Sequence, residues 1–252
     1  MKPGELKDKV ALVTGASKGL GKAMALALAQ AGAKVALVSR DEQLLAQTAQ
    51  AIAALGSEAA VFPADVSNEA RVRALEKEVL ARFGGVHVLI NNAGINLRKP
   101  VTDFTLEEWN SIQTTNVTSA FLMCRSFVPQ MKGQGYGRII NMTSMMSHIS
   151  LPGRTAYSTS KAALLGFTKA LALELAPEKI TVNGISPGPC STEINKALME
   201  NAELTQFFLS RIPAGRWGKP EEIGQLAVYL CSEAAGFITG TDIIIDGGWT
   251  AQ

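Results

Sequence analysis

The stretch "KVALVTGASKGLGKAMALALA", residues 9–29, decides how this chain folds. Its first six residues are almost entirely apolar and predict a buried β-strand, and its last part predicts a helix. Gly15, Gly19 and Gly21 stand between the two segments, where small residues allow the backbone to turn sharply. The stretch therefore predicts a strand, a tight glycine turn and a helix in direct succession.

The same alternation of strand and helix continues along the chain. Strands are predicted at 9–14, 34–39, 59–64, 86–91, 138–143, 180–185 and 241–246. Helices are predicted near 20–31, 41–55, 68–82, 105–131, 158–176 and 220–233. Several strands are apolar almost throughout, which is typical of parallel strands covered on both faces. We therefore expect an α/β fold: a Rossmann-type, doubly wound, seven-stranded parallel sheet with helices on both faces.

We expect residues 1–252 to form a single domain, because no repeat, low-complexity segment or linker interrupts this alternation. The longest irregular region is about 186–218, between the sixth and seventh strands, and it is rich in Pro and Gly. An irregular region of this length is a candidate substrate loop or lid.

The composition excludes several classes of protein. A formal charge of +2 is too small to indicate a nucleic-acid or membrane partner. Cys124, Cys190 and Cys231 are far apart without CxxC spacing, so we expect neither a disulfide framework nor a metal site. The N-terminal residues have no apolar core, and no uninterrupted apolar run reaches about 18 residues. These features predict a cytoplasmic protein.

The glycine turn is a candidate dinucleotide site. A backbone without side chains can approach a pyrophosphate closely, and the N-terminus of the following helix favours negative charge. The candidate contacts are Gly15, Ser17, Lys18, Gly19, Leu20 and Gly21. The alternative is a tight turn that needs glycine for packing alone.

The end of the second predicted strand indicates which dinucleotide binds. Selectivity for NAD usually requires an acidic residue there, but this chain has Ser39 and Arg40. A guanidinium favours the 2′-phosphate of NADP, and Lys18 adds a second cation. We therefore expect NADP(H) to be favoured over NAD(H). Asp41 can oppose this preference or simply cap the next helix, and Arg40 can instead be a solvated surface charge.

The motif "YSTSK", residues 157–161, indicates proton transfer. In a helix, Tyr157 and Lys161 project from one face, one turn apart. A neighbouring ammonium favours the phenolate, so it can move the pKa of the phenol toward the working pH. The alternative is a buried aromatic residue beside a solvated lysine.

Together these motifs resemble the short-chain dehydrogenase/reductase family over essentially the whole chain. The matching segments are "TGASKGLG" (14–21), "DV" (65–66), "NNAG" (91–94), "TTNVTSAF" around Asn116, "NMTSMM" around Ser144, "YSTSK", "SPG" followed by Thr192, and "DGG" (246–248). The gap of thirteen residues from Ser144 to Tyr157 also matches. The resemblance implies an enzyme in which a nicotinamide cofactor carries the hydride.

The resemblance also implies roles for individual residues. Tyr157 would transfer the proton, Lys161 would support it, Ser144 would bind the substrate oxygen, and Asn116 would support a water that relays protons to the lysine. The implied cofactor contacts are Asp65, Val66, Asn91, Ala93, Gly94, Tyr157, Lys161, Pro187, Gly188, Cys190 and Thr192. Two alternatives stay open: Asp65 can cap the following helix, and "NNAG" can be an ordinary turn after a strand.

The sequence indicates the substrate less clearly. The expected pocket wall consists of Met145, Met146, Ile149, Leu151, Pro189 and the loop 193–212 with Phe207 and Phe208. This apolar wall favours a ketone or acyl chain as substrate. The alternative is that these residues belong to the hydrophobic core. His148 can contact the substrate or serve only the loop.

Among family members, the chain looks most like 3-oxoacyl-thioester reductases, with sugar-acid or polyol dehydrogenases of gluconate 5-dehydrogenase type as the alternative. An acyl-carrier-protein partner would require a basic surface near the pocket, for which Arg125, Arg138 and Arg154 are candidates. A non-catalytic NADP-binding redox sensor is a function of another class, and isomerase or lyase chemistry on the same fold is a third.

Two helices have wider apolar surfaces than one sheet face can cover. Residues 162–176 are apolar on nearly all sides, and 105–131 carries a broad apolar surface. We therefore expect a homotetramer assembled through helices near 105–131 and 158–176. The alternative is a wider core within one chain.

Overall fold

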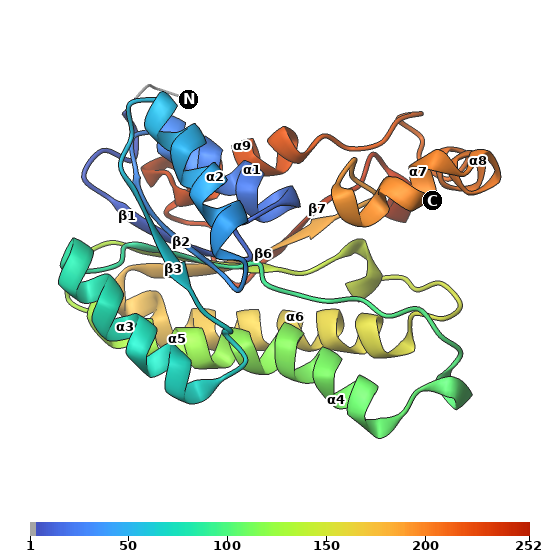
Figure 1. The fold of residues 1–252 in the computed structure, drawn as a ribbon, viewed down its shortest axis with the longest axis horizontal. Coiled ribbons are helices and arrows are strands. Elements are labelled where there is room, and N and C mark those ends of the chain that lie inside the picture. The colour runs from blue at the N-terminus through green and yellow to red at the C-terminus, as the bar shows by residue number, and fades with distance from the viewer. Residues whose placement is uncertain (1–3) are drawn as a thin grey trace.

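The computed structural model describes residues 4–252 and contains one seven-stranded parallel sheet in the order β3-β2-β1-β4-β5-β6-β7 (Figure 1). The strands are β1 (Val10–Thr14), β2 (Lys34–Ser39), β3 (Ala59–Pro63), β4 (Val88–Asn91), β5 (Gly137–Met142), β6 (Ile180–Pro187) and β7 (Asp242–Ile245). The predicted doubly wound α/β fold is therefore confirmed.

Helices cover both faces of this sheet (Figure 1). One layer contains α1 (Gly19–Gln30), α2 (Glu42–Ala54) and α9 (Pro220–Cys231). The other contains α3 (Glu69–Phe83), α4 (Leu106–Gln113), α5 (Ser119–Met131) and α6 (Thr155–Leu175). No helix within residues 4–252 is both long and apolar enough to cross a membrane.

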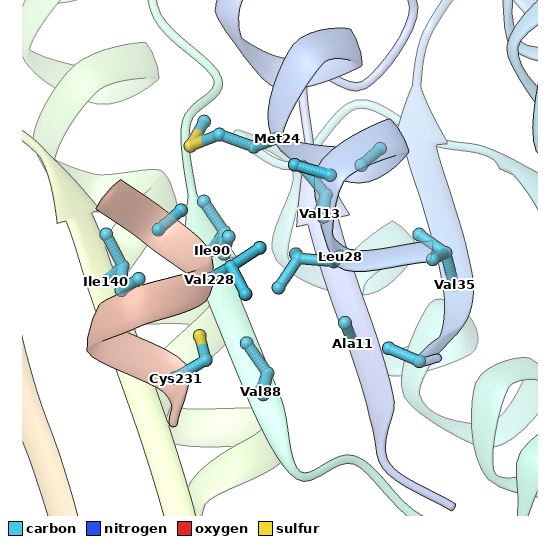
Figure 2. Packing of buried hydrophobic residues seen from close by; sticks show 14 of the residues in the cluster. Ala11, Val13, Met24, Leu28, Val35, Val88, Ile90, Ile140, Val228 and Cys231 are labelled. Atoms are coloured by element: carbon cyan, nitrogen blue, oxygen red, sulfur yellow. The ribbon is translucent and has the colours of Figure 1, made fainter. Parts of the chain in front are cut away.

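Side chains of β1 enter the two cores alternately. Ala11 and Val13 belong to the cluster beneath α1 and α9, whereas Leu12 belongs to the cluster on the opposite face. Figure 2 shows Leu28 of α1 and Val228 of α9 meeting over the sheet. Because both faces of the strand are covered, each of its positions is buried, which explains its unbroken apolar sequence.

The order of the strands determines where a ligand can bind. β1 pairs with β2 on one side and with β4 on the other, so the winding direction changes between β1 and β4. In open parallel sheets, this switch leaves a crevice at the carboxyl ends of the strands. The glycine turn after β1 and residues 92–94 after β4 therefore meet at one crevice.

The predicted helix at 105–131 is a continuous helical run with a widened turn at its centre. α4 leads into a π-helical turn, Thr114–Thr118, which leads into α5. Such turns insert an extra residue into the helix and often occur at functional sites. The wide turn contains Asn116.

The region 186–218 is more regular than predicted. β6 continues to Pro187, and two short helices follow, α7 (Lys196–Glu200) and α8 (Ala202–Leu209). The side chain of Asn201 caps α8 by accepting a hydrogen bond from the Leu204 amide at 2.9 Å. Both helices are too short for a clear periodic pattern, which is why the sequence predicted only a loop.

Candidate active site

A cavity of about 780 Å³ follows the carboxyl ends of the strands. Its wall comes from the glycine turn, the ends of β2, β3 and β5, the turn after β4, helix α6 and the segment after β6. The sequence-predicted residues that line it are Gly15, Ser17, Lys18, Gly19, Leu20, Gly21, Ser39, Arg40, Asp65, Val66, Ala93, Gly94, Ser144, Tyr157, Lys161, Pro187, Gly188, Cys190 and Thr192. Residues from distant parts of the chain thus meet at one site.

The glycine turn has the shape that a pyrophosphate requires. Gly15 has φ +64°, a conformation that other residues rarely adopt. A Cβ atom at Gly21 would lie 2.2 Å from the carbonyl oxygen of Gly15, so a side chain there is excluded. The side chain of Lys18, the N-cap residue of α1, makes no capping hydrogen bond, so the first N–H groups of this helix are available to an anion.

The structure does not bring Asn91 to the cavity wall, so its role as a cofactor contact stays a prediction. Asn91 is the last residue of β4, and its buried amide donates to Asn141 Oδ1 at 2.9 Å. Asn92 lines the cavity instead, and its side chain donates to the carbonyl oxygens of Thr14 at 2.9 Å and Gly15 at 3.2 Å. Successive strand residues point to opposite faces, so an error of one position exchanges the two sides.

The ends of β2 and β3 form the part of the site expected to select the dinucleotide. Asp41 caps α2, because its side chain accepts a hydrogen bond from the Leu44 amide at 3.0 Å. Burial raises the pKa of Asp65, but hydrogen bonds from Ser67 and the charge of Arg40 outweigh burial and lower it. Arg40 is exposed and lies close enough to act on that carboxylate.

Tyr157 and Lys161 lie on one face of α6, as the motif predicted. Lys161 Nζ is 5.7 Å from the centre of the Tyr157 ring and donates a hydrogen bond to the carbonyl oxygen of Met142 at 2.5 Å. Lys161 is only 5% exposed, and burial lowers the pKa of its ammonium to about 8. The lysine is therefore held in place by the end of β5.

The net effect on the phenol differs from the sequence expectation. Burial raises the pKa of Tyr157 above its ordinary value. A hydrogen bond from Ser144 and the charges of Arg154 and Arg98 lower it, but burial outweighs all three. Lys161, which was expected to lower the pKa of Tyr157, is not among the groups that shift it.

Ser144 lies two residues after the end of β5 and lines the cavity. Its hydroxyl accepts a hydrogen bond from the Met146 amide at 3.1 Å, which caps a short turn, Met145–Ser147. A hydrogen bond from the Ser144 side chain is also one of the influences that lower the pKa of Tyr157. Ser144 and Tyr157 thus line the same cavity.

Asn116 does not line the cavity. Its side chain accepts from the Ile95 amide at 2.8 Å and donates to the Ile95 carbonyl oxygen and to Ser160 Oγ, both at 2.9 Å. A Cβ atom at Gly94 would lie 3.2 Å from Asn116 Oδ1 and 3.7 Å from Lys161 Nζ, so Gly94 separates the two groups. The relay role of Asn116 stays a prediction.

Two arginines of the cavity wall were not predicted as site residues. Arg98 is exposed and Arg154 is 8% exposed, and both line the cavity beside Tyr157. Burial, followed by the charge of Arg98, lowers the pKa of Arg154 to about 10. Neither guanidinium forms an ion pair with an acidic side chain within residues 4–252. Two like charges therefore line one pocket, and neither is paired with an acidic side chain of the described residues.

The other two candidate arginines lie elsewhere. Arg125 pairs with Glu69 on the surface at 2.8 Å. Arg138 is buried at the start of β5, where its guanidinium stacks 4.2 Å from the centre of the Tyr136 ring. The three candidates therefore do not form one basic surface.

The predicted apolar wall is present in part. The predicted residues that line the cavity are Met145, Met146, Pro189 and, from the loop 193–212, Glu193, Asn195, Leu198 and Phe208. Ile149 and Leu151 pack against the adjacent cluster instead, and Phe207 is 38% exposed with Arg211 over its ring. His148 also lies outside the cavity wall. Neighbouring residues of a short helix face different sides, which explains why Phe208 enters the site and Phe207 does not.

Known proteins are similar to this chain over nearly its whole length. A family model described as enoyl-(acyl carrier protein) reductase matches residues 15–250. A 2-dehydro-3-deoxy-D-gluconate 5-dehydrogenase from Dickeya dadantii is 38% identical over 98% of this chain and 97% of its own length. A 3-oxoacyl-[acyl-carrier-protein] reductase from Aquifex aeolicus is 36% identical over 97% of this chain and 98% of its own length.

A solved structure of similar sequence also matches this fold. It is a gluconate 5-dehydrogenase from Burkholderia cenocepacia in complex with NADP and tartrate, and it is 35% identical to this chain. The match has a TM-score of 0.92 and covers 98% of this chain and 97% of that one. The likeness therefore extends over the whole sheet and both helical layers.

Proposed function

The chain belongs to the short-chain dehydrogenase/reductase family, and we propose that it interconverts a ketone and a secondary alcohol by NADP(H)-dependent hydride transfer, with Tyr157 as general acid and base. As a member of that family, it is an oxidoreductase that acts on alcohol or carbonyl groups. The observation that carries the proposal is the convergence of Ser144, Tyr157 and Lys161 on the cavity that continues to the glycine turn.

The residues of this chain divide the chemistry among them. The nicotinamide, when bound, supplies or accepts the hydride. Tyr157 donates a proton from its hydroxyl to the substrate oxygen in reduction and accepts that proton in oxidation. Because burial raises its pKa, the phenol retains its proton at neutral pH and is ready to act as the donor. Ser144 donates a hydrogen bond to the same oxygen.

Lys161 provides a positive charge close to the phenol. Its hydrogen bond to Met142 fixes the ammonium at the end of β5. When Tyr157 has given up its proton, this charge stabilises the phenolate. Arg154 and Arg98 act in the same direction. The site thus compensates in part for the cost of a charged phenolate in a buried position.

The preference for NADP(H) is supported by the charges at the end of β2. Arg40 lines the cavity there and Lys18 lines it in the glycine turn, and both are exposed cations that can approach a 2′-phosphate. Asp41 caps α2, which keeps its carboxylate engaged with the helix backbone. The Burkholderia relative was solved with NADP, which agrees with this preference.

We propose a carboxylate-bearing substrate of the sugar-acid type, because two arginines without acidic partners face the catalytic phenol. Arg154 is almost fully buried and has Arg98 as a like-charged neighbour, an arrangement that an anion would stabilise. An arginine pair binds a carboxylate well, because each guanidinium can donate two parallel hydrogen bonds. The Dickeya relative is named for a sugar acid, and tartrate is present with the Burkholderia one.

The test is a panel of carbonyl compounds with NADPH, followed by the loss of NADPH absorbance. We expect turnover of 5-ketogluconate, and Arg154→Met should raise its KM about tenfold or more, because a charged hydrogen bond is lost. Arg73→Met, on the surface of α3, is the matched control and should change nothing. Equal KM values for both variants and the wild type would contradict the carboxylate assignment.

A 3-oxoacyl-thioester reductase is the second candidate. The apolar wall of Met145, Met146 and Phe208 favours it, as does the relative from Aquifex aeolicus. An acetoacetyl thioester has no free carboxylate, so Arg154→Met should leave its KM unchanged. Efficient reduction of the thioester together with no reduction of 5-ketogluconate would favour this candidate.

We also propose that the chain assembles into a homotetramer through α4, α5 and α6. Leu106 is 75% exposed, Leu173 is 80% exposed and Phe121 is 46% exposed, and all three lie on these helices. Large apolar side chains exposed on neighbouring helices are typical of subunit interfaces.

A further inference from the structure

A buried carboxylate lies behind the active site, outside the cavity wall. Asp242 is the first residue of β7, and its side chain is 9% exposed. It accepts hydrogen bonds from Thr143 Oγ1 at 2.5 Å and from Ser186 Oγ at 2.6 Å, and its Oδ2 atom lies 2.7 Å from His148 Nε2. A buried carboxylate without partners is costly, so these three groups are what make the position tolerable.

The sheet leaves room for this carboxylate. Gly184 of β6 is the register partner of Asp242, and a Cβ atom there would lie 2.0 Å from Asp242 Oδ1. Glycine within a strand weakens it, and here it admits a neighbouring carboxylate. The space at Gly184 and the acid at Asp242 therefore form one feature.

This carboxylate is connected to the segment that carries Ser144. It contacts Thr143, directly before Ser144, and His148, four residues after it. Between these two points, Ser186 Oγ lies 2.9 Å from the Ser144 carbonyl oxygen and 2.9 Å from Thr143 Oγ1. The segment is thus attached on both sides of Ser144.

We propose that Asp242, with Ser186 and His148, positions Ser144 so that its hydroxyl meets the Tyr157 phenol. This inference rests on the role proposed above for Ser144. None of the three residues lines the cavity, so they act through the backbone of Ser144 and are positioning residues. Small displacements of catalytic groups slow a reaction strongly, because a shift of about 1 Å can lower the rate roughly a hundredfold.

The primary test observes the phenol without any substrate. The chain has three tyrosines, so protein labelled with ¹³C at tyrosine Cζ gives three resonances, and Tyr157→Phe identifies the one of interest. We expect Ser144→Ala to move the Tyr157 resonance, and Ser186→Ala and His148→Ala to move it in the same direction. His148→Gln, whose amide can still donate to Asp242, should restore it toward the wild-type position.

The matched control is Thr241→Ala, an exposed residue beside Asp242 whose side chain makes no hydrogen bond within the described part of the chain. It should leave the resonance unchanged. If Ser186→Ala does not fold, His148→Ala and His148→Gln still provide the test, because His148 is an exposed residue. An unmoved resonance in Ser186→Ala and His148→Ala would overturn the proposal, and so would an unmoved resonance in Ser144→Ala.

Kinetics give an independent readout. With 5-ketogluconate and NADPH, Ser186→Ala should lower kcat about tenfold while the KM and the NADPH Kd stay near wild type. A rise in KM with unchanged kcat would contradict positioning of Ser144. Failure of the wild type to reduce any carbonyl would instead contradict the proposed function, and the resonance experiment would still decide the positioning role.

Discussion

At the scale of single residues, the site contains ionisable groups whose surroundings oppose their charge. Lys161 is buried, and its pKa falls from 10.5 to about 8. Arg154 is also buried beside a second cation, and its pKa falls to about 10. Burial of these two cations destabilises the folded chain, and ionisable groups with shifted pKa values are typical of functional sites.

The first residue-scale prediction concerns Lys161→Met. With a folded pKa of about 8 against an ordinary 10.5, the folded state binds fewer protons than the unfolded state between these values. The free energy of unfolding of the wild type therefore rises with pH through this window, and this group contributes about 3 kcal/mol to the rise. The methionine variant lacks that gain. Chemical denaturation from pH 7.5 to 10.5 measures the difference, and parallel pH profiles for the two proteins would refute the burial argument.

A second residue-scale prediction concerns Arg40→Ala. Loss of a charged contact to the 2′-phosphate should weaken NADPH binding about tenfold or more and leave NADH binding unchanged. Fluorescence titration with both dinucleotides measures this. Arg73→Ala, which removes a surface arginine paired with Glu69, is the control and should affect neither. An equal loss of affinity for NADH and NADPH in Arg40→Ala would contradict the proposed preference for NADP(H).

Some site residues could be predicted from sequence and others could not. Tyr157 and Lys161 were found because four residues make about one helical turn, a spacing that is visible in the sequence. Asn92 was missed in favour of Asn91 because only the strand register decides which amide faces the crevice. Arg154 was named but could not be placed, because a loop arginine carries no periodic signal.

At the scale of elements, the sequence predicted the long units and missed the short ones. β1 and α1 were clear because their apolar patterns extend over whole elements. α7 and α8 were missed, because a helix of five or eight residues between Pro and Gly has little periodicity. Their position depends on contacts between distant segments. The centre of the Phe208 ring in α8 lies 5.7 Å from the centre of the Trp249 ring and 5.5 Å from that of the Trp217 ring.

The element-scale prediction is that Phe208→Ala releases α7 and α8 locally. Loss of the buried ring should expose Lys196 and Arg211 on either side to trypsin, so cleavage should accelerate. The midpoint of global unfolding should change little, because this cluster is separate from the two main cores. Leu204→Ala, at a position of α8 that is 41% exposed, is the matched control and should be cleaved as the wild type is. Identical cleavage rates in both variants would show that Phe208 does not hold these helices.

At the scale of the whole molecule, the order of the strands brings residues from positions 15 to 192 to one crevice. A second feature at this scale is a set of large apolar side chains exposed on one helical layer. Leu106 and Leu173 are exposed on the layer that contains α4, α5 and α6 (Figure 1). The sequence indicated this surface, because these helices have more apolar faces than the sheet can cover.

The whole-molecule prediction is that sedimentation at micromolar concentration shows a tetramer, and that Leu173→Glu shifts it toward smaller species. A charge in a buried interface is costly, so the effect should exceed that of a surface change. Leu55→Glu, at the end of α2 and 44% exposed, is the control. A wild-type chain that sediments only as a monomer would exclude the tetramer.

The most direct measurement compares Tyr157→Phe with the wild type in two assays on the same preparation, NADPH binding and NADPH oxidation with the substrate from the carbonyl panel. Removing one hydroxyl leaves the ring and its packing in place, so NADPH should bind within about twofold of the wild-type affinity while turnover falls by a hundredfold or more. Turnover at the wild-type rate in this variant would contradict proton transfer by Tyr157 and, with it, the proposed mechanism.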